Sequence, residues 1–207
     1  FDEWNVWYRT GHDPLKDVEE IYNYTDALTV ASLMHTILRN TKTIELACIS
    51  LLVNTLGSIF TDRKRMVRQS IWHSQKMIRD AHAGYIVETV VDCPVFSAKH
   101  ERFFCGIVDP EKAKDEKLPS LLHFDDIPAL DAVSSVDEKN GKLTISIIQK
   151  LEDRPLNVRL DLHGITPKGN GMTMHRLTGG NDLLAENTLD TPDRIGIETR
   201  QVPLAEI

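Results

Sequence analysis

The sequence predicts an α/β segment followed by an all-β segment, with the change near Gly84. Before that glycine, apolar residues recur mainly at three- and four-residue steps, as on one face of a helix. After it, short β-branched runs alternate between apolar and polar side chains, as in antiparallel strands that bury one face. The order of elements over residues 1–84 is typical of an α/β barrel, and residues 85–207 are typical of an antiparallel β-sandwich.

The first segment is expected to hold an opening strand, three helices and a second strand. Residues 1–8 read Phe-Asp-Glu-Trp-Asn-Val-Trp-Tyr, and this run predicts a core strand with an acid at its end. Thr25 and Asp26 can cap the first helix, because short polar side chains accept hydrogen bonds at helix starts. The other predicted elements are a helix over about 43–56, a short buried strand over 57–61 and a helix from 69 to about 83.

The second segment is expected to be built from short strands and turns. A strand is predicted over 85–91, followed by a long irregular connection over about 97–126. The runs 132–136 and 143–147 flank a turn that contains Asn140-Gly141, which is typical of a hairpin. Apolar and polar residues alternate over 156–162, which predicts another strand with one buried face. Two more strands are predicted over 172–177 and 194–199.

Composition limits the classes of partner. The net charge of −7 and the isoelectric point near 5.6 disfavour binding to nucleic acid or to an anionic membrane. Because no run of about 18 apolar residues occurs, no membrane span is expected. The chain opens without Met on residues typical of the middle of a core strand, which predicts a fragment of a longer protein. Cytoplasmic and secreted locations both stay open, as does assembly into a homo-oligomer.

The cysteine and histidine patterns favour no metal or cofactor site. Cys48, Cys93 and Cys105 lack CxxC spacing, which argues against a disulfide framework or a zinc site, while a single disulfide between two of them stays open. The pair His100-Glu101, and His123 near two aspartates, fall in the irregular connection without the i, i+4 spacing of helical ligands. We therefore predict that the chain carries no metal and no cofactor.

The opening strand is the best candidate for a catalytic element. Carboxylates act as acid, base or nucleophile in glycoside cleavage, and aromatic faces stack on the apolar faces of sugar rings. The alternative is a structural acid in an ion pair at the end of a buried strand. Asp2 and Glu3 alternate to opposite sides of a strand, so only one of them can face a cleft there.

Residues 2–8, Asp-Glu-Trp-Asn-Val-Trp-Tyr, resemble the nucleophile motif of glycoside hydrolase family 51, the α-L-arabinofuranosidases. Further stretches follow that family in order and spacing: 24–28, 47–49 with 52–54, 68–72, 130–132 with 140–141, and 187–188 with 192–196. The chain departs from the family at 64–67, where glycines are usual, and at Ser74, where proline is usual. The family's closing strand is not evident by Ile207.

The resemblance implies the last two units of a (β/α)8 barrel over 1–84 and the C-terminal β-sandwich over 85–207. It implies a retaining enzyme in which Glu3 is the nucleophile, Trp7 stacks near the leaving-group sugar and Gln69 hydrogen-bonds the bound arabinose. The acid/base glutamate of the family lies on the fourth barrel strand, outside this sequence. The fragment by itself is therefore expected to be inactive.

The expected activity is hydrolysis of terminal non-reducing α-L-arabinofuranosyl residues of arabinan, arabinoxylan or their oligosaccharides. Two alternatives stay open at this point. One is a related endoglucanase or xylosidase, because the barrel accepts such changes of specificity. The other is a non-catalytic carbohydrate-binding β-sandwich protein with a decayed barrel.

Overall fold

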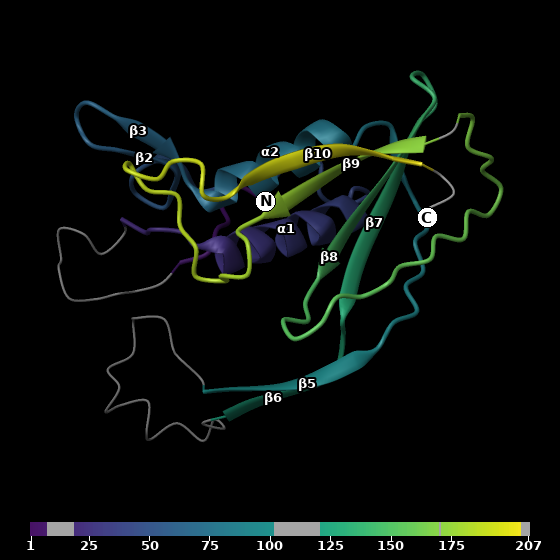
Figure 1. The fold of residues 1–207 in the computed structure, drawn as a ribbon, viewed down its shortest axis with the longest axis horizontal. Coiled ribbons are helices and arrows are strands. Elements are labelled where there is room, and N and C mark those ends of the chain that lie inside the picture. The colour runs from purple at the N-terminus through teal and green to yellow at the C-terminus, as the bar shows by residue number, and fades with distance from the viewer. Residues whose placement is uncertain (8–18, 102–120, 170, 204–207) are drawn as a thin grey trace.

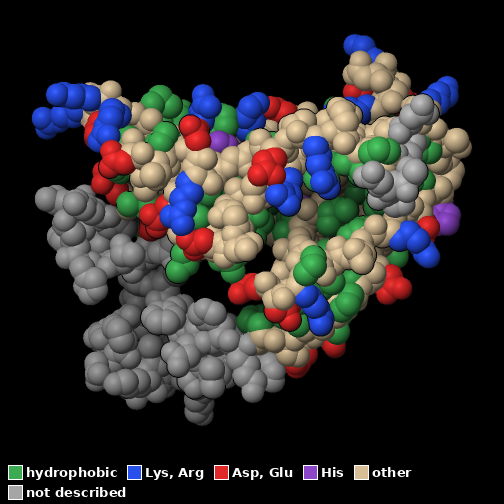
Figure 2. Space-filling view, viewed as in Figure 1, with side chains coloured by type: hydrophobic (Ala, Val, Ile, Leu, Met, Phe, Trp, Pro, Cys, Tyr) green, Lys and Arg blue, Asp and Glu red, His purple; other side chains and the backbone are tan. Residues whose placement is uncertain are grey.

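The computed structural model describes residues 1–7, 19–101, 121–169 and 171–203. Figure 1 shows the two helices side by side, a two-stranded ribbon crossing one face of them, and a separate hairpin that projects away from the rest. Acidic and basic side chains are interspersed over the face drawn in Figure 2. Within the described residues, neither helix is long and apolar enough to cross a bilayer.

Helix α1 (Tyr24–Arg39) confirms the first predicted helix, although its N-cap lies two residues before Thr25. Asn23 is the N-cap: its Oδ1 accepts from the Asp26 N–H at 3.1 Å, and Asp26 Oδ2 accepts from the Asn23 N–H at 2.8 Å. This reciprocal capping box satisfies two N–H groups that a helix start leaves free. Asp26 is thus part of the cap, as its N3 residue.

The predicted helix over about 43–56 is wrong. Residues 46–50 are extended and run parallel to residues 1–4, with Trp4 bridged to Ile49. The N–H groups of Cys48 and Ser50 donate to the carbonyls of Phe1 and Trp4 at 3.2 and 2.9 Å. Apolar residues in this stretch happen to fall at helical spacing, but a parallel strand also reads as a nearly continuous apolar run, and a short run does not separate the two.

A small sheet follows this pair of extended segments. Strand β1 (Leu51–Val53) pairs in parallel with β2 (Gly57–Thr61), which pairs antiparallel with β3 (Met66–Arg68). The prediction of a strand over 57–61 is confirmed. The connection from β1 to β2 is so tight that a Cβ on Gly57 would lie 2.7 Å from the Val53 backbone. Glycine is therefore required at position 57 by the close approach of two chain segments.

Helix α2 (Ser70–Ala81) confirms the predicted helix after the basic loop, with Gln69 as its N-cap residue. Strand β4 (Tyr85–Val87) follows and pairs antiparallel with β7 (Leu130–Asp137), which pairs with β8 (Lys142–Gln149). The predicted 132–136 and 143–147 hairpin is thereby confirmed. Strands β9 (Gly171–Thr178) and β10 (Gly196–Pro203) form a separate antiparallel ribbon, close to the last two predicted strands.

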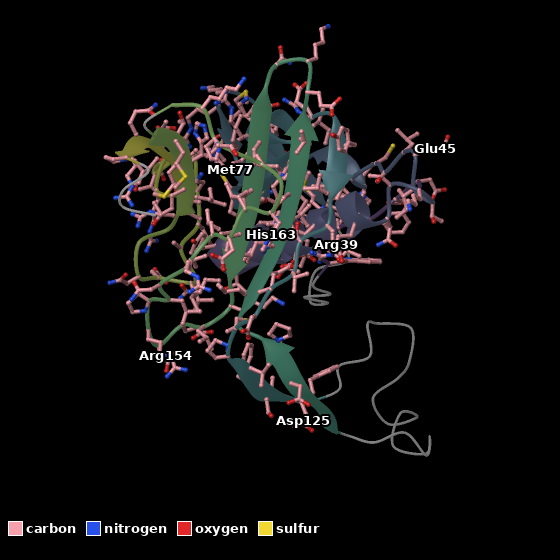
Figure 3. All side chains as sticks on the ribbon, turned by 90° about the vertical axis from the view of Figure 1, so that its right-hand side faces the viewer. Arg39, Glu45, Met77, Asp125, Arg154 and His163 are labelled. Carbon is pink, nitrogen blue, oxygen red and sulfur yellow. The ribbon has the colours of Figure 1, made fainter. Side chains whose placement is uncertain are left out.

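Two predictions for the second segment need correction. The connection predicted as irregular over 97–126 contains most of a hairpin, β5 (Val95–Glu101) with β6 (Leu121–Pro128), which projects below the other sheets with Asp125 on it (Figures 1 and 3). The alternating stretch 156–162 forms no strand, and within the described residues no strand pairs with it. Its alternation produces no sheet because strands need a hydrogen-bonding partner as well as a side-chain pattern.

Helix α1 is the centre of the described core. Its buried residues Ala27, Val30 and Ala31 each enter a different apolar cluster. The cluster of Ala27 also holds Leu177, Ala185 and Ile195 from the β9–β10 region. The cluster of Val30 holds Tyr22 and Ile71, at the start of α2. The cluster of Ala31 holds Ile78 of α2 and Ile148 of β8. Two of the clusters combine residues from both sides of Gly84, so the two predicted units pack against each other through this helix. The division at residue 84 itself stays a prediction.

Candidate functional site

Glu3 is exposed and lies within the extended segment formed by residues 1–6. Trp4 and Val6 pack against the cluster of Tyr22, Val30 and Ile71 that lies under the helices. Because successive side chains of an extended chain point to opposite faces, Glu3 is directed away from that cluster. The Ser50 hydroxyl, on the neighbouring parallel segment, donates a short hydrogen bond to Glu3 Oε1.

A buried network fixes the segment that carries Glu3. Asn5 Nδ2 donates to the Tyr22 hydroxyl at 3.1 Å and to the Leu56 carbonyl at 2.7 Å. The Tyr22 hydroxyl in turn donates to the Val6 carbonyl at 2.9 Å, and Tyr22 is fully buried. The backbone on the C-terminal side of Glu3 is therefore held to the start of α1 and to the β1–β2 connection. Such a rigid support is what a catalytic carboxylate requires.

Trp7 is 40% exposed and lies four residues beyond Glu3, at the end of the first described segment. This position agrees with the predicted stacking role, which stays a prediction because the structure contains no sugar.

Gln69 is almost completely buried, at 1% exposure, and its amide bridges three backbone groups. Oε1 accepts from the Tyr22 N–H at 2.9 Å, and Nε2 donates to the carbonyls of Glu20 and Gly57 at 3.1 and 2.8 Å. Both amide hydrogens are thus in use, and one lone pair of Oε1 remains for another donor. The predicted hydrogen bond from Gln69 to arabinose stays a prediction, and in this structure the side chain ties β2 to the residues before α1.

A surface cavity of about 230 Å³ lies beside Gln69, between β2, the β2–β3 loop and residues 187–190. Phe60 and Ile21 form apolar parts of its wall, and Arg65 closes one side through ion pairs with Asp62 and Asp190 at 3.0 and 2.8 Å. The Arg65–Asp190 ion pair therefore links the β2–β3 loop to the C-terminal segment.

Asn187 makes a second link between the two halves of the chain. It is buried, and its Nδ2 donates to the carbonyls of Arg68 and Ile195 at 3.2 and 2.9 Å while its Oδ1 accepts from the Ile195 N–H at 2.7 Å. The motif at 187–188 belongs to the family resemblance, but its linking role could not be derived from sequence because its partners are distant backbone groups.

A buried histidine of α1 lies between a serine and an aspartate that are both partly buried. His35 Nδ1 lies 3.2 Å from Asp131 Oδ2, and its Nε2 lies 2.7 Å from Ser146 Oγ. Burial opposes ionisation of Asp131, but hydrogen bonds from His35 and Arg39 outweigh it and hold the pKa of that carboxyl below its usual range. Because His35 is fully buried between α1 and the sheet, a substrate has no access to its ring, and we assign this group to packing.

The described residues contain no group of three or more His, Cys, Asp or Glu side chains placed to hold a metal ion. Cys48 and Cys93 are free thiols. Cys105 and the side chains of His100, Glu101 and His123 lie outside the part of the chain described, so the interpretation of those residues is not tested.

Sequence reasoning did not identify Ser50, Asn5 or Tyr22 as parts of the site. The erroneous helix over 43–56 placed Ser50 on a helix rather than on a strand beside Glu3. Asn5 and Tyr22 are brought together by α1 and the β1–β2 connection, and neither residue type marks a site without that context.

Comparison with known proteins places these features in a family. The α-L-arabinofuranosidase C-terminal domain family matches residues 2–206. α-L-arabinofuranosidase C of Emericella nidulans is 25% identical over 182 residues, covering 87% of this chain and 32% of the relative. Intracellular exo-α-(1→5)-L-arabinofuranosidase 1 of Bacillus subtilis is 27% identical over 173 residues, covering 79% of this chain and 30% of that protein.

The same family is found among solved structures. The α-L-arabinofuranosidase of Thermotoga maritima, solved as an arabinose complex, superposes with a TM-score of 0.79 at 25% identity, over 98% of this chain and 38% of the solved one. The family 51 enzyme of Thermotoga petrophila gives a TM-score of 0.80 at 25% identity with the same coverage. The chain spans about a third of the length of these relatives. It belongs to the α-L-arabinofuranosidase C-terminal domain family and corresponds to the C-terminal portion of family 51 glycoside hydrolases.

Proposed function

We propose that this chain is the C-terminal portion of a retaining α-L-arabinofuranosidase and that Glu3 is its nucleophile. The observation that carries the proposal is the exposed Glu3 carboxylate on one of two parallel extended segments, on the face opposite the packed Trp4 and Val6. Related proteins named arabinofuranosidases support the substrate class.

The backbone arrangement supports a barrel as the setting of the site. Residues 1–6, helix α1 and residues 46–50 form a strand, helix and parallel strand, which is the repeating unit of a (β/α)8 barrel. Parallel strands need such a crossover and are normally covered on both faces. Strand β1 instead exposes Leu51, Leu52 and Val53 at 46, 62 and 45%. We propose that the preceding barrel units of the complete enzyme cover this edge.

The chemistry proposed for Glu3 is a double displacement. One carboxylate oxygen attacks the anomeric carbon of an α-L-arabinofuranosyl unit, while an acid outside this chain protonates the departing sugar oxygen. Water then attacks the same carbon, the acid/base group takes its proton, and the bonding electrons return to the Glu3 carboxylate. We propose that Trp7, which is 40% exposed and lies four residues beyond Glu3, stacks against the leaving-group sugar.

The test is nucleophile replacement in the full-length enzyme with an aryl α-L-arabinofuranoside as substrate. Loss of a nucleophile commonly costs several orders of magnitude in kcat, so Glu3→Ala should reduce hydrolysis at least about a thousandfold. Added azide should restore turnover of Glu3→Ala by occupying the vacated space and attacking the anomeric carbon. The control is Asp2→Asn, which changes the adjacent carboxylate on the other face of the segment and should retain activity.

Three results would contradict the proposal. Near wild-type hydrolysis by Glu3→Ala would remove Glu3 from the reaction. Faster cleavage of aryl xylosides than of arabinofuranosides by the unmodified enzyme would change the proposed substrate class to xylosides. A protein that binds arabino-oligosaccharides without cleaving any of these substrates would be a carbohydrate-binding protein instead.

A further inference from the structure

We infer that Ser50 is a positioning residue for the nucleophile: its hydroxyl holds one oxygen of the Glu3 carboxylate and stabilises that carboxylate when it leaves the sugar. The inference rests on the proposed role of Glu3. It assigns a function to Ser50, which lies on the neighbouring extended segment. Within the described residues, the bond to Glu3 is the one hydrogen bond of the Ser50 side chain.

Strand pairing, rather than a flexible side chain, sets the position of Ser50. Its backbone N–H donates to the Trp4 carbonyl at 2.9 Å, and Trp4 is bridged to Ile49 in parallel register. The Ser50 hydroxyl is one rotatable bond from this backbone, and Trp4 directly follows Glu3. The donor is therefore attached to the same pair of segments as the carboxylate it contacts, and little conformational freedom is lost when the hydrogen bond forms.

The hydrogen bond from Ser50 gives the two carboxylate oxygens of Glu3 different roles. Ser50 Oγ donates to Oε1, which leaves Oε2 for attack on the anomeric carbon. In the covalent intermediate the bonded oxygen belongs to an ester, and Oε1 is its carbonyl oxygen. A hydroxyl that donates to Oε1 holds the carboxyl plane in one orientation throughout both steps.

The hydroxyl should matter most in the second step. As water attacks the anomeric carbon, the bond between that carbon and Glu3 breaks and its electron pair returns to the carboxylate. Negative charge then develops on both carboxylate oxygens, and a hydrogen bond to a charged group is stronger than one to a neutral ester. Ser50 therefore favours hydrolysis of the glycosyl-enzyme. In the first step Ser50 also stabilises the ionised Glu3 carboxylate before it attacks. This stabilisation of the starting state offsets part of the rate increase that the fixed orientation gives to the first step.

The experiment compares Ser50→Ala with Ser50→Thr in the full-length enzyme, using an aryl arabinofuranoside with a good leaving group. For Ser50→Ala we expect kcat to fall about tenfold, the size of a lost hydrogen bond to a charged group, with KM falling in parallel. A burst of phenol in the first turnover should grow as the glycosyl-enzyme accumulates. Ser50→Thr keeps the hydroxyl and should restore most of kcat. A residue needed merely for folding would lower the active fraction and leave KM unchanged.

The control is Ser97→Ala, which removes another exposed serine–carboxylate hydrogen bond, to Asp125 on the projecting hairpin, at 2.7 Å. It should leave kcat, KM and the burst unchanged. If Ser50→Ala fails to fold, the isosteric pair Ser50→Thr and Ser50→Val carries the comparison, because these two variants differ by the hydroxyl. Equal kinetics for Thr and Val, or wild-type kinetics for Ala, would overturn the inference.

Failure of this inference can be told apart from failure of the proposed function. If Glu3→Ala is inactive while the Ser50 variants behave like wild type, Glu3 remains the nucleophile and the role of Ser50 is rejected. If Glu3→Ala keeps its activity, both are rejected.

Discussion

Replacement of Gln69 by alanine separates the two roles open to this residue. The side chain is 1% exposed and its amide makes three hydrogen bonds to backbone groups of Tyr22, Glu20 and Gly57. Alanine would remove all three at once and leave an N–H and two carbonyls without these partners. If the amide is a structural bridge, the main effect is on stability; if it is a sugar ligand, the main effect is on KM.

The expected loss of stability follows from the contacts. A buried backbone group left without its partner costs about 1–3 kcal/mol, and relaxation or entry of water recovers part of it. For three groups we expect about 3–5 kcal/mol of lost unfolding free energy, which is large for a single substitution. Gln201→Ala is the matched control, because Gln201 is exposed on β10 and bonds to the Thr173 hydroxyl at 2.9 Å. Its effect should stay within about 0.5 kcal/mol.

The assay is urea-induced unfolding of the full-length enzyme, followed together with kcat and KM on an aryl arabinofuranoside. We expect the urea midpoint of Gln69→Ala to fall well below those of wild type and Gln201→Ala. An unchanged midpoint together with a KM raised about tenfold or more would refute the structural reasoning and establish the predicted sugar contact.

Two further substitutions test other parts of the fold. Gly84→Ala should lower the free energy of unfolding by more than about 3 kcal/mol, because φ is +76° and a Cβ would clash with the Val136 carbonyl. Gly164→Ala has the same φ and open space around it, so it should lower that free energy by about 1 kcal/mol. Similar unfolding midpoints for the two variants would contradict the clash. Burial, with positive charge from His35 and Lys142, lowers the pKa of His82 to about 4 from an ordinary value of 6.5. The unfolded chain therefore binds more protons between these values, and stability should fall by about 1–2 kcal/mol, after allowance for partial solvent screening, as pH drops through that window. His82→Gln should flatten this dependence in unfolding curves measured from pH 7 to 4, and an unchanged slope would assign it to other groups.

The sequence predicted elements best where one pattern excluded the others. The run 57–61 begins with a glycine, is followed by four charged residues and is too short for a helix, and it forms β2. The runs on either side of Asn140-Gly141 have a turn between them, and they form the β7–β8 hairpin. In both cases the signal is local, so the neighbouring residues suffice to determine the structure.

Prediction failed where the deciding partner was distant in sequence. The run containing Leu46 and Ile49 fits a helix and a buried strand equally well, and the parallel neighbour that selects the strand is residues 1–4. The alternation over 156–162 fits a strand, but within the described chain no strand edge is paired with it. For the candidate site, the motif alone proposes Glu3, whereas the contact of Glu3 with Ser50 and the partners of Gln69 required the tertiary structure.

A chain of contacts links the C-terminal strands to the candidate nucleophile. On β9, the Leu177 carbonyl accepts from the Tyr24 hydroxyl at 3.0 Å, and the Leu183 carbonyl accepts from the Thr25 N–H at 3.1 Å, so the β9 region holds the first turn of α1. Tyr22, two residues earlier, bonds to Asn5, next to the segment that carries Glu3. The β-rich segment therefore supports the proposed nucleophile through the start of one helix, without contributing a described side chain to it. Under the proposed function, the β-rich segment would thus act by fixing the helix start to which the segment with Glu3 is bonded.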